Sequence, residues 1–372
     1  MFARVRPRAF IYGIVMLLVV SLVSILNNET GFIAEKVASF AAYDIYQGTN
    51  FTLGFFVQYI LLWIPFELFD DKYAAHGLNM GLQAFTFMLG ARFVFNMKSS
   101  WMLALFTLFP SYYHYSIFGL RDPLINLVVV LVVIAAMRQN TKQFVITCMA
   151  LSVLSIGIRA ELSMILMGFA GIKMYFDVSG AKRLLLILAG IAALYVALLI
   201  LPLAFGVPST GSVAGNIDSM VQFNELRNER RLGEYGSGSH ILGGALYGYQ
   251  FGVRYPVQIG ASFLAPLPVD IRSSLDALAL FESVLFIFAA FCGYKAARLN
   301  QTSLILFCCG IAYMLLQAIF AINYGNILRV RYPCLIIFLG AVAVLDLYGP
   351  DRIIQKSDGR LFGIFRRRRS VP

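Results

Sequence analysis

Arginine residues, in two cases with a carboxylate beside them, recur where apolar segments of this chain begin or end. The motifs are FGLRDPL (Arg121, Asp122), GIRAEL (Arg159, Glu161) and NYGNILRVRYP (Arg329, Arg331). Taking a guanidinium out of water is costly unless a partner compensates its charge. Its planar fork binds phosphate oxygens in a bidentate manner and never loses its proton. These three turns therefore indicate an anion site, for which a lipid-linked phosphate is a fitting ligand. The alternative is a set of local ion pairs and interfacial anchors.

Four other arginines and two other titratable groups complete the candidates. The arginines lie in or after the polar run FNELRNERRLGEY, and they are Arg227, Arg230, Arg231 and Arg254. The first three form one basic face, because residues three and four apart share a side of a helix. Glu282 lies within an apolar run, and His240 in SGSHILGG is a candidate general base or merely a solvated loop side chain. With three histidines and no paired carboxylates, we expect no metal and no cofactor.

The composition places these groups in a membrane. Hydrophobic residues make up 59% of the 372 positions and charged residues 13%, about half the charge of a soluble domain. Long apolar stretches such as 10–26, 184–205 and 277–294, of which only the last carries a charge (Glu282), approach the roughly 20 residues that cross a bilayer. The net charge of +11 is spread in short clusters between apolar runs, which is typical of orientation signals and not of nucleic-acid binding. All five cysteines lie in apolar runs without metal or disulfide spacing.

The basic clusters also orient the chain. With the Lys- and Arg-rich loops in the cytoplasm, ten spans alternate consistently and both termini are cytoplasmic. The spans are predicted near 9–26, 75–94, 101–118, 123–137, 143–158, 161–176, 184–204, 276–294, 302–322 and 328–348. The stretch 51–69 is also long, but it contains Pro65 and Glu67, and counting it would place the basic tail outside. We predict a re-entrant or interfacial helix there, on the outer face.

The predicted fold is therefore an all-α polytopic membrane protein of the bacterial inner membrane. Residues 1–372 form one integral membrane domain, with a large periplasmic loop at 206–275 and a basic cytoplasmic tail at 349–372. Two prolines in APLPVD exclude a regular helix between 261 and 271. The chain shows no internal repeat and few charges away from span ends, which argues against a transporter of inverted halves or an ion-coupled carrier. The arginine-rich turns fall on the outer face.

Several of these motifs resemble a known group of membrane proteins. They are GLRDPLI, the Arg-Ala-Glu turn, FLAPLPVDIRSSLDALALFESVLFIF and NYGNILRVRYPCLIIFL. In these scattered patches the chain is similar to O-antigen polymerase-like and GT-C-type glycosyltransferases of bacterial polysaccharide clusters. The resemblance implies an enzyme of lipopolysaccharide or exopolysaccharide biosynthesis. Such an enzyme transfers a glycan from undecaprenyl pyrophosphate to the next lipid-linked repeat unit at the periplasmic face.

The resemblance also implies roles for individual residues. Pyrophosphate contacts would come from Arg121, Arg159, Arg329 and Arg331, and the carboxylates to test are Asp122, Glu161 and Glu282. The implied partners are the undecaprenyl-pyrophosphate-linked oligosaccharide, membrane lipids and a chain-length regulator, with no nucleic acid. The motif NNETGF in the first outer loop lacks an acidic pair, which departs from the GT-C pattern and argues against a metal-dependent mechanism.

Two alternatives to the polymerase stay open on the sequence. One is a GT-C glycosyltransferase that uses a polyprenyl-phosphate sugar to decorate a lipid-linked glycan. The other is a non-enzymatic flippase or assembly component. The glycan of a strain that lacks the chain separates them. Loss of a polymerase leaves one repeat unit on lipid A–core, loss of a decorating enzyme removes one sugar at unchanged length, and loss of a flippase abolishes surface glycan.

The ten-span topology predicts the outcome of reporter fusions. Alkaline phosphatase fused after residue 240 should be active, because that loop is periplasmic, and a fusion after residue 365 should be inactive. The measurement is phosphatase activity per amount of fusion protein. An active fusion after residue 365 would contradict the ten-span prediction and make 51–69 a true span.

Overall fold

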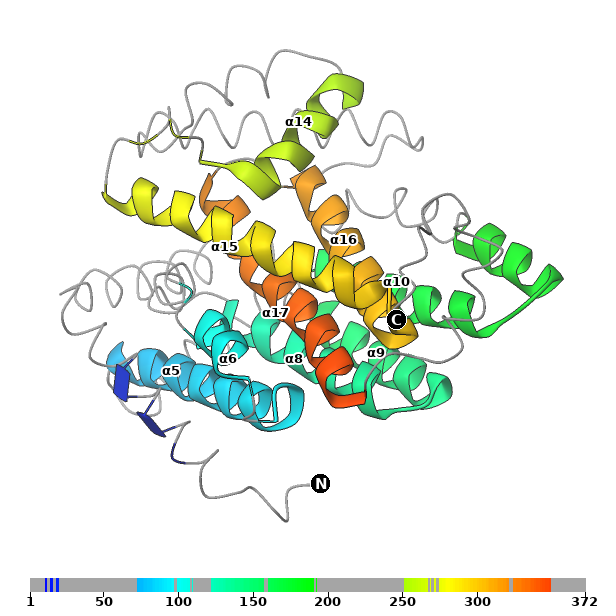
Figure 1. The fold of residues 1–372 in the computed structure, drawn as a ribbon, viewed down its shortest axis with the longest axis horizontal. Coiled ribbons are helices and arrows are strands. Elements are labelled where there is room, and N and C mark those ends of the chain that lie inside the picture. Colours follow the sequence, from blue (N-terminus) through cyan, green and yellow to red (C-terminus); the bar gives the residue numbers. More distant parts are fainter. Residues whose placement is uncertain are drawn as a thin grey trace, which may run out of the picture.

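The computed structural model describes residues 11, 14, 15, 18, 19, 72–96, 99–107, 109, 122–156, 160–190, 192, 251–266, 268, 271, 274–320 and 324–348. Every regular element in this part of the chain is helical, as the sequence predicts. The elements are α5 (Lys72–Leu89), the π-helical η2 (Gly90–Val94), α6 (Ser100–Thr107), α8 (Asp122–Arg138), α9 (Thr141–Ile156), α10 (Ala160–Asp177), α14 (Phe251–Leu264), α15 (Ser274–Ala297), α16 (Gln301–Phe320) and α17 (Tyr324–Tyr348) (Figure 1).

Three of the described helices contain stretches long and apolar enough to cross a membrane. These stretches are Ala277–Ala297 in α15, Gln301–Ala318 in α16 and Leu328–Tyr348 in α17. Large apolar side chains also face outward, among them Val153 on α9 and Val284 on α15, which are 68% and 59% exposed. Soluble proteins rarely expose contiguous apolar surface of this kind, whereas lipid solvates it. These features are consistent with a membrane protein.

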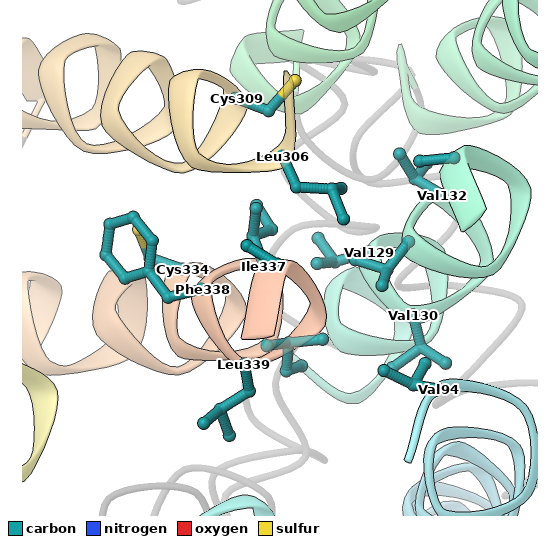
Figure 2. Close-up of a cluster of buried hydrophobic side chains, with 14 of the residues drawn as sticks. Val94, Val129, Val130, Val132, Leu306, Cys309, Cys334, Ile337, Phe338 and Leu339 are labelled. Carbon is teal, nitrogen blue, oxygen red and sulfur yellow. The ribbon is translucent and has the colours of Figure 1, made fainter. Parts of the chain in front are cut away.

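Helix α17 forms the centre of the bundle. In its apolar stretch 83% of the residues are buried, against 33% for the stretch in α15. It packs against α15, α16 and α8, and more lightly against α14, α6 and η2. Figure 2 shows Ile337 of α17 beside Leu306 of α16 and Val129 of α8. The ring of Phe338 packs against Phe286 of α15 and Phe307 of α16. The residues that α17 carries therefore meet protein on nearly every side.

Small residues and serine hydroxyls allow the helices to approach closely. The Ser303 hydroxyl on α16 donates to the Ala341 carbonyl of α17 at 2.7 Å, and Ser152 on α9 donates to the Ser163 carbonyl of α10 at 3.0 Å. A Cβ atom built on Gly340 would lie 2.6 Å from Cγ1 of Val133 on α8. Such contacts are the usual basis of helix association where lipid removes the hydrophobic driving force.

The predicted helical segments correspond closely to the observed helices. The stretches predicted at 123–137, 143–158, 161–176, 276–294, 302–322 and 328–348 coincide with α8, α9, α10, α15, α16 and α17, within a few residues at each end. The predicted span 101–118 overlaps the shorter α6. The number of spans and their orientation stay predictions, and 51–69 lies outside the described residues.

The predicted large loop at 206–275 contains a packed element. Helix α14 occupies its C-terminal part and packs against α15, α16 and α17. Its last helical residue is Leu264, and the Ala265–Pro266 peptide bond is cis. The helix ends before the two prolines of APLPVD, as expected from their missing N–H groups. The prediction that no regular helix occurs between 261 and 271 is wrong for residues 261–264, which precede the prolines and form the last turn of α14. The remainder of the loop, up to residue 250, lies outside the described residues.

The contact at Gly340 predicts a stability difference between two glycines. Gly340→Val places methyl groups against the stiff, β-branched Val133, so it should destabilise the bundle by about 1–3 kcal/mol. Gly171→Val on α10 is the matched control, because nothing lies within 4 Å of its Cβ position. The measurement is the temperature at which each purified variant loses its monodisperse peak in detergent. Equal temperatures for the two variants would contradict the close α8–α17 packing.

Candidate functional site

An ion pair joins the beginnings of α8 and α17. The Arg329 Nε donates to both carboxylate oxygens of Asp122, at 3.2 and 3.0 Å, and Nη2 donates to Oδ2 at 2.7 Å. This is the bidentate geometry that makes arginine–carboxylate pairs strong and directional. The side chains of Arg329 and Asp122 are 18% and 9% exposed, so the pair is shielded and yet reachable from outside.

Local sequence explains why Asp122 starts a helix at this position. Asp122 is the first residue of α8 and Pro123 the second. Proline at the first turn of a helix loses no hydrogen bond, because its missing N–H would have no partner inside the helix. A carboxylate in the first turn is stabilised by the positive end of the helix dipole. The motif RDPL therefore begins a helix with a fixed negative charge, and the long-range partner of that charge is Arg329.

Arg331 lies on the opposite face of the same helix. Residues two apart on an α-helix are separated by about 200°, so Arg331 points away from Asp122. Its Nε donates to the Ser262 carbonyl at 2.9 Å, its Nη2 to the Ala261 carbonyl at 3.3 Å and its Nη1 to the Ser283 hydroxyl at 2.7 Å. The residue is fully buried. All three guanidinium nitrogens thus have acceptors within the protein.

These contacts make Arg331 a cap for the end of α14. Ala261 and Ser262 belong to the last turn of α14. The Ala261 carbonyl also accepts from the Ala265 N–H at 2.9 Å, whereas the Ser262 carbonyl has no such donor, because residue 266 is a proline. A cation at a helix C-terminus is also favoured by the helix dipole. Glu282, 1% exposed on α15, interacts electrostatically with Arg331 from the other side. Arg331 therefore fastens α14 to α15 and α17.

The structure separates the two arginines that the sequence groups together. A single phosphate bound by Arg329, on the α8 side, would not reach the guanidinium of Arg331, on the α14 side. Of the predicted carboxylates, Asp122 forms an ion pair with Arg329, and Glu282 interacts electrostatically with Arg331. A phosphate-binding role for either arginine stays a prediction.

The side chains of the other predicted residues lie outside the described part of the chain. Residues Arg121, Arg159, Arg227, Arg230, Arg231 and His240 lie outside the described part of the chain. Glu161 lies in α10 and Arg254 in α14, and their side chains also lie outside the described residues.

Buried amides are the polar groups that the sequence reasoning missed. Gln83 on α5 is fully buried, and neither its Oε1 nor its Nε2 has a hydrogen-bond partner. Asn126 on α8 is 3% exposed, and its Oδ1 has no partner. On α16, the buried Nε2 of Gln317 also has no hydrogen-bond partner. A buried amide without a partner costs about 1–3 kcal/mol, and such groups in a native protein call for an explanation. In the sequence, the only sign of these groups is an amide residue within an apolar stretch.

Comparison with known proteins does not assign a family. No protein-family model, curated protein or solved structure matches the chain. The structure itself defines an all-helical bundle in its described part, with three helices fit to cross a membrane and a shielded arginine–aspartate pair at one end.

The contacts of Arg331 predict a structural defect on its replacement. Arg331→Met removes the charge and three donors but keeps a long side chain, which leaves the α14 carbonyls and Glu282 without their cation. We expect the folded yield to fall by an amount that reflects a loss of about 3–5 kcal/mol, the usual cost of breaking a buried pair. Ser283→Ala, which removes one acceptor of three, should have a much smaller effect. The measurement is the monodisperse fraction in detergent, and equal yields for Arg331→Met and wild type would contradict the capping role.

Proposed function

We propose that this chain is a repeat-unit polymerase. In this reaction a glycan is transferred from undecaprenyl pyrophosphate to a hydroxyl of the next lipid-linked unit. The observation that supports it best is the bidentate Arg329–Asp122 pair, which holds a phosphate-binding fork and a carboxylate together at a partly exposed position. The two residues come from distant outer-turn motifs, and α8 and α17 bring them together.

The proposed chemistry needs these two groups and little else. The bond between the anomeric carbon and the pyrophosphate oxygen breaks, and a bond from that carbon to the acceptor oxygen forms. The departing pyrophosphate takes the bonding electron pair, and the acceptor hydroxyl loses a proton. Arginine neutralises the charge that develops on the leaving group, and a carboxylate accepts the proton.

The pair also provides a way of sensing the donor. Arg329 offers one fork, and Asp122 occupies it in the structure. A bound pyrophosphate replaces the carboxylate on that fork, because both anions fit the same donors. Asp122 is then released to face the acceptor hydroxyl. In this proposal the base becomes available only when the donor is present.

Substitutions at Arg329 test the proposal. Lysine keeps the charge but lacks the fork, so Arg329→Lys should lose most of the activity. We expect rates to fall about 30- to 1,000-fold, which corresponds to roughly 2–4 kcal/mol of lost transition-state stabilisation. Polymer length is measured in a strain that lacks the chain and expresses each variant, normalised to membrane-inserted protein. Arg138→Lys is the control, because Arg138 lies at the other end of α8 and stacks on Phe93.

A charge exchange separates catalysis from folding. The double variant Asp122→Arg/Arg329→Asp retains an ion pair between α8 and α17, so it should be inserted and folded. It should make no polymer, because the fork and the base have exchanged places. Polymer of normal length from this variant, or from Arg329→Lys, would show that the pair is structural. A deletion strain whose glycan keeps its normal length would exclude a polymerase altogether.

A further inference from the structure

Two amides without partners lie at the same end of the bundle as the Arg329–Asp122 pair. Asn126 follows Asp122 by one helical turn and lies about 40° around α8 from it. On the same helix, Val129 lies beside Ile337 of α17, and Val130 lies beside Val94 of η2 (Figure 2). The direction of Asn126 falls between these two. Its side chain, which is 3% exposed, therefore points into the interior of the bundle, between the α17 and η2 neighbours of α8.

Helix directions place Gln83 at the level of the ion pair. Helix α8 runs parallel to α17, because Asp122 pairs with Arg329 and the Tyr348 hydroxyl donates to the Met137 carbonyl. Phe87 and Tyr332 both contact Phe106, and Val94 lies beside Val130, so α5–η2 runs in the same direction as α8. At about 1.5 Å per residue, Gln83 lies about 16 Å before Val94, and Asp122 lies about 12 Å before Val130. The two residues are thus within about one turn of each other along the bundle.

Aromatic contacts show that Gln83 faces the interior. Phe87, one turn after Gln83 and on the same side of α5, packs edge-on against Phe106 at 5.4 Å. Phe106 in turn stacks on Tyr332, whose hydroxyl donates to the Phe106 carbonyl. Tyr332 lies one turn after Arg329 on α17. Phe106 of α6 therefore lies between the stripe of α5 that carries Gln83 and the turn of α17 that follows Arg329.

Resting on the proposed function, we propose that Gln83 and Asn126 bind hydroxyl groups of the glycan beside the Arg329–Asp122 pair. A carboxamide offers both donors and an acceptor, and a sugar hydroxyl is both donor and acceptor, so the two groups satisfy each other. A glycan bound there would supply the partners that the buried amide atoms lack. The pair would hold the pyrophosphate and the transferred proton, and the amides would orient the sugar.

Leucine substitutions should weaken glycan binding without lowering the melting temperature. Replacing a buried, unpaired amide by an apolar side chain of similar size removes a destabilising group. Gln83→Leu and Asn126→Leu should therefore leave the melting temperature in detergent unchanged or raised. If the amides bind sugar, the same variants should bind the glycan about five- to tenfold more weakly each. Gln317→Leu is the matched control, because it removes an equally buried amide nitrogen without a partner from α16. It should keep wild-type binding.

Two lipids separate sugar contacts from pyrophosphate contacts. The probes are undecaprenyl pyrophosphate carrying one repeat unit, extracted from the deletion strain, and undecaprenyl pyrophosphate alone. Affinity is measured for purified full-length protein in nanodiscs. The leucine variants should lose affinity for the first lipid and keep wild-type affinity for the second.

Each result has a defined meaning. If the leucine variants bind both lipids as wild type does, the amides are not sugar ligands, and the proposed function stands. If wild type binds neither lipid, the proposed function and this inference both fail. If the leucine variants melt far below wild type, the amides have partners within the protein, and the inference is overturned.

Discussion

Placing guanidinium groups in the central helix of an apolar bundle constrains everything around them. Arg329 and Arg331 lie near the start of α17, where the helix becomes buried on nearly all sides. An uncompensated buried charge costs several kcal/mol, so each group needs acceptors within reach. The positions of α8 and α14 follow from this need. Asp122 starts α8 where Arg329 can reach it, and α14 ends where its carbonyls meet Arg331.

Arg329 and Arg331 are compensated by different kinds of acceptor. Arg331 is fully buried and is held by two carbonyls and a hydroxyl, so its contacts are those of a fixed structural joint. Arg329 donates to the Asp122 carboxylate in a shielded but partly exposed position, and an incoming anion can replace a carboxylate. Only the second arrangement is suited to exchange. That difference is why the proposed chemistry is assigned to Arg329 and not to its neighbour two residues away.

Buried amides, like buried charges, need partners within the bundle. In lipid-embedded helices an amide is normally satisfied by a neighbouring helix. Ser303 and Ser152 show this in the present bundle, where each hydroxyl donates to a carbonyl of the adjacent helix. Gln83 and Asn126 depart from the pattern although they too are buried. Asn126 lies one helical turn after Asp122 on α8, which is why a ligand role is proposed for it and not for every buried amide.

The sequence by itself determined the helical elements and the residues to examine. Apolar runs of sufficient length, ended by RDPL or by APLPVD, define helix boundaries locally, because proline and helix-end charge act within one turn. It also singled out Asp122, Glu282, Arg329 and Arg331. Only the tertiary structure decided which of them meet. The 200° that separates Arg329 from Arg331 matters only once helices occupy both faces of α17, and the pairing with Asp122 joins residues 207 apart in sequence. The unpaired state of Gln83 and Asn126 was likewise invisible in the sequence, because a missing partner is a property of the packed neighbours and not of the residue.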